Sequence, residues 1–363
     1  MSLERERLDW LRLARAESVG PVTFARLIER YGSAGNALAA LPDLARRGGG
    51  AGAPLIPNLD EARTELAAGT AIGAHLITGG DEGFPRLLAV LDPPPPLLWT
   101  IGDAALLGRR AVGVVGARIA SAAGRRFART LAAELGEAGY VVISGMARGI
   151  DAAAHEGALP FGTIAVLGGG EDDVYPPDNR ELYDAIKASG CIVSERPPGH
   201  TARAADFPRR NRLIAGLSLG VIVVEAEMKS GSLITARLAG EQGREVFAVP
   251  GSPLDPRAHG TNDLLRQGAT LVESALDVIR VLDAQPGVSA PETAMFDFSG
   301  TGDETAIERV RAMVEDLLSP APVTIDDLAR ATGAPISTVL AVLMELSVAG
   351  RADLLPGGLV AST

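Results

Sequence analysis

Cysteine is nearly absent from the sequence, and histidine is rare. The 363 residues include one cysteine, Cys191, and four histidines that show no metal-ligand spacing. A lone cysteine excludes an internal disulfide and any zinc site built on cysteines. The sequence therefore predicts neither a disulfide-stabilised scaffold nor a bound metal ion.

Long apolar runs are also missing. No uninterrupted apolar stretch reaches the ~20 residues that a membrane-spanning helix needs. No basic and apolar leader opens the sequence, and Glu4, Glu6 and Asp9 argue against a transit peptide. We therefore expect a soluble protein of the reducing cytoplasm that has no membrane partner.

Positive charge is scarce as well. The chain has 34 Lys and Arg against 45 Asp and Glu, which gives a net charge of −11. Proteins that bind nucleic acid through general charge attraction need clustered Lys and Arg to displace counterions. Any such binding here must come from a local basic patch inside an acidic molecule.

Aromatic residues make up only 4% of the chain, although 47% of its residues are hydrophobic. The core must therefore be built mainly from Ala, Val, Leu and Ile. A chain of this length has room for two or three domains. Segments with different patterns do follow one another along it.

Residues 1–70 have the pattern of short helices. Apolar residues recur at helical spacing in 8–17 and in 24–41, and a glycine–proline turn at 18–21 separates the two stretches. Two helices around such a turn resemble helix-hairpin-helix or SAM-like domains, some of which contact DNA backbone through the hairpin. Because this hairpin carries no cation, a plain helical packing domain is the favoured interpretation.

Residues 71–285 alternate between short apolar runs and helical stretches. The runs are rich in Val and Ile and begin near residues 112, 140, 163, 191, 219 and 245. Buried runs joined by crossover helices are typical of a parallel sheet that is covered on both faces. The predicted fold class is therefore α/β, with an extended Rossmann-like, doubly wound parallel sheet. Ligands of such sheets bind at the carboxyl ends of the strands.

The rest of the chain predicts a linker and a small helical domain. Residues 286–304 are rich in Pro, Gly, Ser and Thr without periodicity, which is typical of a linker. Residues 305–363 predict three helices and a short hairpin, and Thr324 with Asp327 resembles a capping box at the second helix. Three helices followed by a hairpin are typical of a winged-helix domain.

The first candidate binding loop follows the run near residue 112. It contains Gly116, Arg118 and Ser121, and a helix is expected from about Ala122. Glycine lets a ligand come close to the backbone, arginine can hold two phosphate oxygens, and a helix N-terminus adds free N–H groups. Many strand–helix turns have this composition by chance, so this loop alone is a weak signal.

The second loop follows the run near residue 140, and its candidate ligand-binding residues are Gly145, Arg148 and Gly149. A helix that begins near Ala147 would place Arg148, Asp151 and His155 on one face. In that arrangement Arg148 faces a ligand and Asp151 orients it. The alternative is an ordinary Arg–Asp pair beside a half-buried histidine.

The third loop supplies the local basic patch that the acidic average requires. Its candidate residues are Phe207, Arg209, Asn211 and Arg212. An aromatic ring beside several arginines can stack a base and hold its backbone. The alternative is a set of surface arginines paired with acids, but Asp206 is the only acid between Arg203 and Arg212. We therefore favour a binding role.

The fourth loop follows the run near residue 219, and its candidate residues are Ser230, Gly231, Ser232 and Thr235. Ser-Gly-Ser at the start of a helix offers hydroxyl and backbone N–H groups to an anion. The Gly-Lys-Ser/Thr order of a Walker A loop is missing, which argues against ATP hydrolysis.

The motifs around these loops resemble one known family. In chain order they are SGMARGIDAAAHEGAL, GTIAVLGGG, YPPDNREL, SERPPGH, FPRRNRLIAGLS, KSGSLITARLA, GREVFAVPG and GTNDLLRQGA. Their order and spacing over residues 71–275 resemble the DprA/Smf family, whose name stands for DNA-processing protein A. The helical N-terminal segment and the winged-helix segment also resemble accessory domains of this family.

This resemblance implies a function without catalysis and without a cofactor. It implies a homodimer that binds single-stranded DNA, protects incoming strands and loads the recombinase RecA onto them in natural transformation. It assigns DNA contact to the candidate residues of all four loops. The dimer and RecA surfaces are expected at about residues 246–268.

The sequence departs from the family pattern at two places. The first loop has Ala117 where a serine is usual, which removes one hydroxyl from the predicted phosphate contact. The third helix of the winged-helix segment, residues 335–348, has no Lys or Arg, whereas a helix that reads a DNA groove carries basic or amide side chains. We therefore predict that this segment is not the main DNA reader, and that this helix serves packing or a protein contact.

Two enzymatic functions compete with this interpretation. The core also resembles LOG-type phosphoribohydrolases, but Arg237 and Leu238 stand where those enzymes have acids, which leaves Glu225 and Glu241 as substitutes. A metal-dependent nuclease needs converging carboxylates. The consecutive acids of residues 171–173 do not converge, and we expect them to be solvated.

Overall fold

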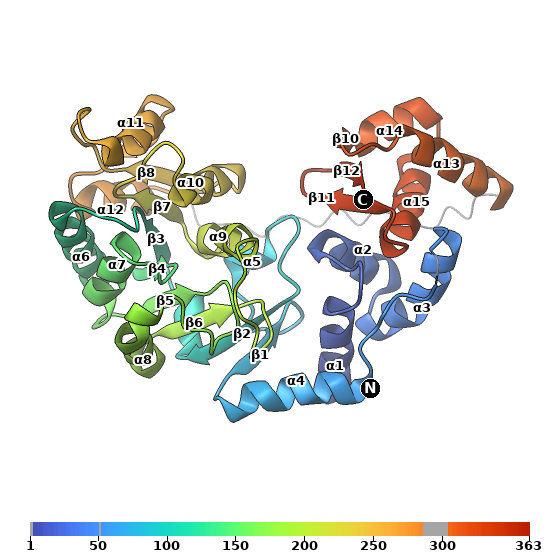
Figure 1. Cartoon of the computed structure of the whole chain (residues 1–363), viewed down its shortest axis with the longest axis horizontal. Coiled ribbons are helices and arrows are strands. Elements are labelled where there is room, and N and C mark those ends of the chain that lie inside the picture. The colour runs from blue at the N-terminus through green and yellow to red at the C-terminus, as the bar shows by residue number, and fades with distance from the viewer. Residues whose placement is uncertain (1–2, 51, 286–303) are drawn as a thin grey trace. The chain divides into compact units, whose positions relative to one another are not determined.

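The computed structural model describes residues 3–50, 52–285 and 304–363 (Figure 1). The predicted linker, 286–304, therefore lies outside the described residues except for its last position. The chain divides into two compact units. The larger unit contains Glu65–Leu91 and the described part of Leu98–Ala290, and the smaller contains Met1–Thr64, Asp92–Leu97 and the C-terminal segment.

The larger unit is built on a nine-stranded sheet with the order β1-β2-β6-β5-β4-β3-β7-β8-β9. The strands are β1 (His75–Thr78), β2 (Leu97–Gly102), β3 (Ala111–Val115), β4 (Val141–Ser144), β5 (Thr163–Val166), β6 (Cys191–Ser194), β7 (Gly220–Val223), β8 (Glu245–Ala248) and β9 (Thr270–Leu271). The strands from β6 to β9 in this order are parallel, whereas β2 pairs antiparallel with β6. The six predicted strands are β3 to β8, and the predicted fold class is confirmed.

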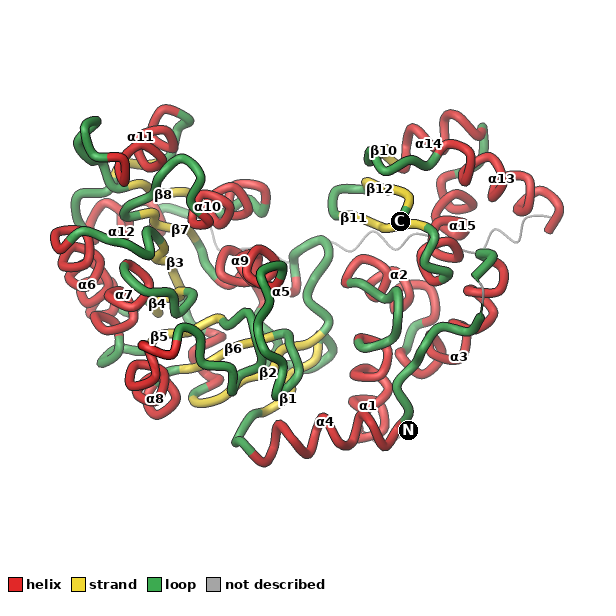
Figure 2. Tube along the Cα trace, viewed as in Figure 1, coloured by secondary structure: helices red, strands yellow, loops and turns green. Residues whose placement is uncertain are grey.

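Helices cover both faces of this sheet (Figure 2). They are α5 (Arg86–Ala89), α6 (Ala122–Glu137), α7 (Ile150–Ala158), α8 (Arg180–Ser189), α9 (Asp206–Leu217), α10 (Gly231–Glu241), α11 (His259–Arg266) and α12 (Ala275–Asp283). Side chains alternate along a strand, so β3 contributes side chains to the core on each face of the sheet. Val112 and Val114 pack with α6, α7 and α12, whereas Ala111 and Val115 pack with α9 and α10.

The strand order reverses direction at β3. From β3 the chain continues through β4, β5 and β6 on one side, and then returns to place β7, β8 and β9 on the other side. A doubly wound sheet leaves a crevice outside the carboxyl ends of its strands at such a reversal. The loops that follow β3, β4 and β7 therefore meet at one place.

The smaller unit contains both the N-terminal and the C-terminal segments of the chain. Its elements are α1 (Leu3–Ala14), α2 (Pro21–Tyr31), α3 (Ala34–Arg47), the start of α4 (Leu59–Ala71), α13 (Glu304–Leu317), β10 (Val323–Thr324), α14 (Ile325–Thr332), α15 (Ile336–Val348), β11 (Ala352–Leu355) and β12 (Leu359–Ser362). The three strands pair in the order β10-β12-β11 and form the predicted winged-helix arrangement. Thr324 accepts a hydrogen bond from the Asp327 amide, so the predicted cap is confirmed.

The core of the N-terminal helices also takes in side chains of the C-terminal segment, which has a second core of its own. Met344 and Val348 of α15 pack with buried residues of α1, α2 and α3, and the hydroxyls of Thr23 and Ser347 lie 2.9 Å apart. Most of α15 is buried. Its lack of cations is therefore explained by packing against this chain's own helices.

No single helix in the described ranges is long and apolar enough to cross a membrane. Only the bent pair α14 and α15 passes that test jointly, by length and composition.

Candidate nucleic-acid interface

The first two predicted loops pack against each other through their backbones. The Ile150 amide donates a hydrogen bond to the Ala117 carbonyl at 3.2 Å. Gly149 has φ +81° at this contact, and a Cβ there would lie 2.3 Å from the Ala117 oxygen. Only glycine allows this approach. The loop that carries Arg118 is thus held by the loop that carries Arg148.

The second loop does not form the helical face that its sequence suggested. Helix α7 begins at Ile150 and not near Ala147, because Gly149 leaves the helical region of backbone conformation. The Asp151 carboxyl group turns back and accepts hydrogen bonds from the amides of Gly145 (3.1 Å) and Ala147 (3.3 Å). Exposed Arg148 pairs instead with Asp178, at 2.6 Å. The predicted orientation of Arg148 by Asp151 is therefore wrong.

His155 is buried, and its chemistry predicts a stability that depends on pH. Its Nδ1 lies 2.7 Å from the Thr163 hydroxyl, and its Nε2 has no partner among the described residues. Burial, together with the positive charge of Arg210, lowers the pKa of His155 to about 3. The imidazole therefore stays neutral in the folded state at pH values where the unfolded chain binds a proton.

We expect this histidine to destabilise the fold as the pH falls from 6.5 towards 3. In that window the unfolded state binds more protons, so the free energy of unfolding decreases with decreasing pH. Two units below 6.5 the loss from this group is about 3 kcal/mol. Urea unfolding at pH 7 and pH 4.5 should show a smaller loss for His155→Gln than for the wild type. Exposed His75→Gln is the control, and equal losses in all three proteins would contradict the prediction.

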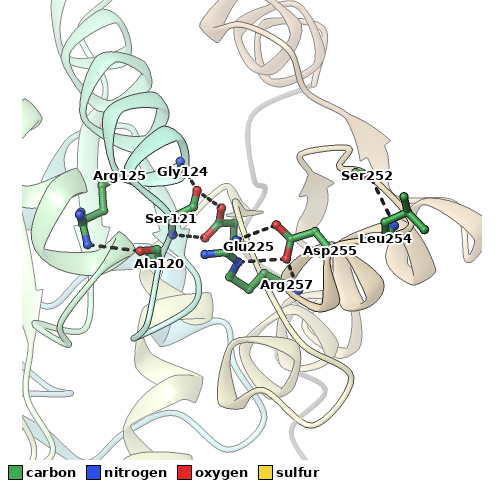
Figure 3. Close-up of polar contacts among 9 residues, drawn as sticks. All are labelled: Ala120, Ser121, Gly124, Arg125, Glu225, Ser252, Leu254, Asp255 and Arg257. Carbon is green, nitrogen blue, oxygen red and sulfur yellow. Dashed lines mark hydrogen bonds and ion pairs between the residues drawn. The ribbon is translucent and has the colours of Figure 1, made fainter.

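The N-terminus of α6 is occupied by a side chain of the protein itself (Figure 3). Glu225, which follows β7, accepts hydrogen bonds from the Ser121 hydroxyl (2.6 Å) and the Ser121 amide (2.9 Å). Ser121 in turn caps the helix by accepting from the Gly124 amide. A Cβ at Gly124 would lie 2.5 Å from the Glu225 carboxylate, so the carboxylate fills this space. The Ser121 hydroxyl thus has an internal partner, and Glu225 is used as the partner of a helix cap.

Helix α9 carries the basic segment, and its arginines lie in different environments. Arg209 is exposed, whereas Arg210, which was not among the predicted residues, is buried. Arg212 forms an ion pair with Glu195. The Asn211 amide group donates to the Gly231 carbonyl at 3.4 Å, which ties α9 to the fourth loop. Arg212 and Asn211 therefore act within the protein, and Arg209 remains directed at solvent.

Phe207 belongs to an aromatic cluster at the start of α9. Its ring lies 5.4 Å from that of Tyr175, and the Arg118 guanidinium lies 5.7 Å from the Phe207 ring centroid. Tyr175 is 50% exposed. Sequence reasoning missed Tyr175, although an aromatic residue in a Pro-rich loop after a strand was the available signal.

The Tyr175 loop is attached to the second loop. The Asn179 side chain donates to the Met146 carbonyl at 2.7 Å, and Asp178 is the partner of Arg148. These contacts hold Tyr175 at the carboxyl edge of the sheet. A base could thus stack on the cluster of Tyr175 and Phe207 while Arg118 holds its phosphate.

The fourth loop opens α10. Ser230 caps the helix by accepting from the Ser232 amide, and the two hydroxyls lie 2.6 Å apart. Ser232 and Thr235 are buried, whereas Gly231 and the neighbouring Lys229 are exposed. The loop therefore presents one helix N-terminus and one cation to solvent.

Five exposed cations of these loops lie along one edge of the sheet, and one of them, Arg148, is paired with exposed Asp178. These cations follow β3, β4, β6 and β7, whose carboxyl ends share that edge. They are Arg118, Arg148, Arg203, Arg209 and Lys229. The negative charge of Asp206, the acid within the basic segment, is balanced by its ion pair with Arg196. Burial opposes its ionisation, but hydrogen bonds from His200, the Arg203 amide and Arg196 lower its pKa to about 2.

The acids at 171–173 behave only partly as expected. Asp172 accepts from the Gly199 amide and Asp173 from the Ala202 amide, both at 2.8 Å, and Glu171 is buried. The prediction that they are solvated is wrong for Glu171, whereas Asp172 is exposed as expected. Asp172 and Asp173 also brace the loop before α9. In the part of the chain that the structure describes, no three His, Cys, Asp or Glu side chains gather to hold a metal ion.

Comparison with known proteins agrees with this fold. The profile of DNA recombination-mediator protein A matches residues 75–283, that of the DprA-like N-terminal HHH domain matches 4–68, and that of the DprA winged-helix domain matches 302–358. Protein Smf of Synechocystis sp. is 38% identical over 296 residues, 77% of this chain and 74% of that protein. Protein Smf of Escherichia coli is 38% identical over 293 residues, 79% and 77% of the two chains.

Two solved structures are similar to this chain. DNA processing protein A of Streptococcus pneumoniae aligns with a TM-score of 0.63 and 35% identity over 76% of this chain and 96% of its own. That of Helicobacter pylori, whose structure describes a single-stranded DNA binding mode, aligns with a TM-score of 0.53 and 33% identity over 58% and 95%. From its sequence, its fold and these matches, the chain belongs to the DprA/Smf family of DNA recombination-mediator proteins.

Proposed function

We propose that this chain binds single-stranded DNA at the carboxyl edge of its large sheet. The observation that carries the proposal is the aromatic cluster of Tyr175 and Phe207 with Arg118 beside it, at the edge of the sheet that also carries the other exposed cations. Aromatic faces stack on any base, and cations follow the backbone, so such a site is tolerant of sequence and sensitive to salt. Duplex DNA binds less well in this proposal because its bases are already stacked.

The predicted residues divide into two groups in this proposal. Those that contact DNA directly are Arg118, Arg148, Phe207, Arg209, Ser230 and Gly231, joined by Tyr175 and Lys229. Those that shape the site through contacts within the protein are Gly116, Ser121, Gly145, Gly149, Asn211, Arg212, Ser232 and Thr235. The second group keeps the loops at the spacing that the first group needs.

We further propose that the chain acts as a mediator that protects incoming strands and loads RecA onto them in natural transformation. Family membership supports this role, since the matching profile describes a recombination mediator. A homodimer would present two DNA sites and gain avidity on a long strand. Leu254, within the segment expected to hold the dimer and RecA surfaces, is 92% exposed and is available to a partner. We propose no catalytic step, because Glu225, one of the two acids left for the phosphoribohydrolase alternative, is engaged with Ser121.

Substitutions in the aromatic cluster test the DNA site. Phe207→Ala should weaken binding of a fluorescent oligo-dT by roughly 5- to 150-fold, since one base stack contributes about 1–3 kcal/mol. Arg118→Ala should also weaken binding and lower the slope of log K against log salt by about 0.7, the value for one phosphate contact on a single strand.

The matched control is Arg110→Ala. Arg110 precedes β3 and therefore lies at the opposite, amino edge of the same sheet. The Arg110→Ala variant should bind the oligonucleotide with the affinity of the wild type in a salt titration followed by fluorescence anisotropy. Wild-type affinity in both Phe207→Ala and Arg118→Ala would refute the site. RecA filament growth on single strands, accelerated by the wild type but not by Phe207→Ala, tests the mediator role.

A further inference from the structure

Two oppositely charged side chains are buried on either side of Gly145. Arg210 of α9 and Asp151 of α7 are both largely inaccessible to solvent. Burial raises the pKa of the Asp151 carboxyl group and lowers that of the Arg210 guanidinium, and the opposite charge of each group counteracts the shift of the other. A Cβ at Gly145 would lie 1.7 Å from Nη1 of Arg210, so the guanidinium packs directly on the backbone of the second loop. The Gly145 amide donates to Asp151 on its other side.

Arg210 connects three elements around the proposed DNA site. Its Nη1 donates to the carbonyl of Val166, the last residue of β5, at 3.0 Å. It covers Gly145 in the loop that carries Arg148, and it stands three residues after Phe207 on α9. Asp151 meanwhile holds the amides of Gly145 and Ala147. Together the two side chains connect the loop that carries Arg148 to the helix that carries the aromatic ring.

Stability alone does not account for charges at this place. Removing two charges from water is costly, and apolar side chains of similar volume often stabilise a core equally well or better. Apolar side chains form no directional hydrogen bonds, so they cannot hold the Gly145 and Ala147 amides and the Val166 carbonyl at fixed positions. Burial lowers the pKa of Arg210 only to about 10, so the guanidinium remains a cation near neutral pH.

We propose that Asp151 and Arg210 are positioning residues that lock the loop carrying Arg148 and the helix carrying Phe207 into one geometry, so that the phosphate and the base of the same stretch of DNA bind together. The inference rests on the proposed single-stranded DNA site. Neither side chain contacts DNA, since both are buried beneath the loop. Their effect reaches the ligand through the backbone of Gly145 to Ala147 and through α9.

The full-length double variant Asp151→Leu/Arg210→Met separates positioning from stability. Each single variant leaves one buried charge without its counterpart and should unfold at lower urea concentration than the wild type. The double variant should recover most of that loss. Its affinity for oligo-dT should nevertheless stay at least tenfold below the wild type. Recovery of wild-type affinity together with stability would overturn the inference.

A spectroscopic readout distinguishes positioning from a general loss of structure. An oligonucleotide that contains 2-aminopurine reports stacking through quenching of its fluorescence. We expect the wild type to quench it on binding and the double variant, at saturating concentration, to quench it much less. Full quenching by the double variant would mean that the aromatic cluster still receives the base, which would refute the role of the pair.

Arg210→Lys provides a test that does not depend on the double variant folding. Lysine keeps the positive charge opposite Asp151 but lacks the planar fork that reaches the Val166 carbonyl and covers Gly145. We expect a folded protein with about five- to tenfold weaker binding and reduced quenching. Unchanged binding would overturn the inference.

The control is Arg110→Met, an arginine lost from the opposite edge of the same sheet, which should change neither binding nor quenching. If Phe207→Ala and Arg118→Ala also bind normally, the proposed function itself fails. If those two variants lose binding and the Asp151 and Arg210 variants do not, only this inference fails.

Discussion

Gly149→Ala is expected to abolish most single-stranded DNA binding, although the residue itself offers no side chain to DNA. The new Cβ would lie 2.3 Å from the Ala117 oxygen and 2.7 Å from the Arg118 oxygen, both of them backbone atoms that cannot rotate away. The backbone at φ +81° adds strain for any residue other than glycine. Relief requires the two loops to part, which moves Arg118 away from the Phe207 ring.

We expect this substitution to lower the stability of the larger unit by about 2–4 kcal/mol, as other changes at strained glycines do. The loss of oligo-dT affinity should exceed tenfold, and anisotropy at a temperature where the variant is still folded measures it. Gly240→Ala is the matched control, because a Cβ there meets nothing within 4 Å and the site lies inside α10. Alanine at that position should be neutral or slightly stabilising.

The result is informative in both directions. Binding within twofold of the wild type would mean that the first two loops need not touch for the site to work. Loss of binding in both glycine variants would point to a general sensitivity of the domain and not to this contact. Only a selective loss in Gly149→Ala supports a site that is built by two loops packed backbone to backbone.

Six strands of the large sheet, β3 to β8, were predictable because each belongs to a short apolar run rich in Val and Ile between helices. Strands β1 and β2 at one end of the sheet and β9 at the other end were not predicted. β2 joins the sheet by antiparallel pairing with β6, about 90 residues later in the chain, and a local pattern does not contain that partner. The start of α7 was misplaced for a related reason. The apolar pattern of 147–158 is helical, but the contact of Gly149 with Ala117 decides where the helix can begin.

The site was predictable as a set of loops and not as a set of contacts. Arg118, Arg148 and Phe207 were found because strand-end loops with arginine and an aromatic ring have a recognisable composition. The partners that give the other residues their roles are distant in sequence. Ser121 meets Glu225 across 104 positions, and Asn211 meets Gly231 across 20. Burial also separates Arg210 from Arg209, which composition alone treats as equals.

Deleting residues 304–363 is expected to unfold the N-terminal helices while leaving DNA binding largely intact. Helix α15 supplies Met344 and Val348 to the core of α1–α3. It also approaches α3 so closely that a Cβ at Gly48 would lie 2.1 Å from the Glu345 oxygen. Each large buried side chain lost contributes about 2–5 kcal/mol, so losing the whole helix removes an amount comparable to the stability of a small domain.

Hydrogen exchange measures the outcome segment by segment. In the shortened chain the amides of α1, α2 and α3 should lose their protection, whereas β3, β4 and β7 should keep theirs. Affinity for oligo-dT should stay within about threefold of the full chain, since the proposed contacts all lie in the larger unit. Retained protection in α1–α3 would show that this helical domain is stable without α15.

A full-length substitution tests the same coupling without a truncation. Met344→Ala leaves a cavity where α15 packs on α1–α3, and it should destabilise these helices by about 2–4 kcal/mol. Leu343→Ala, the neighbouring residue, faces the core of the winged helix itself and is the comparison. If the two halves fold as one cooperative unit, both variants weaken the protection of α1–α3. If only Met344→Ala does so, the halves are separate domains in contact, and the buried α15 serves each of them independently.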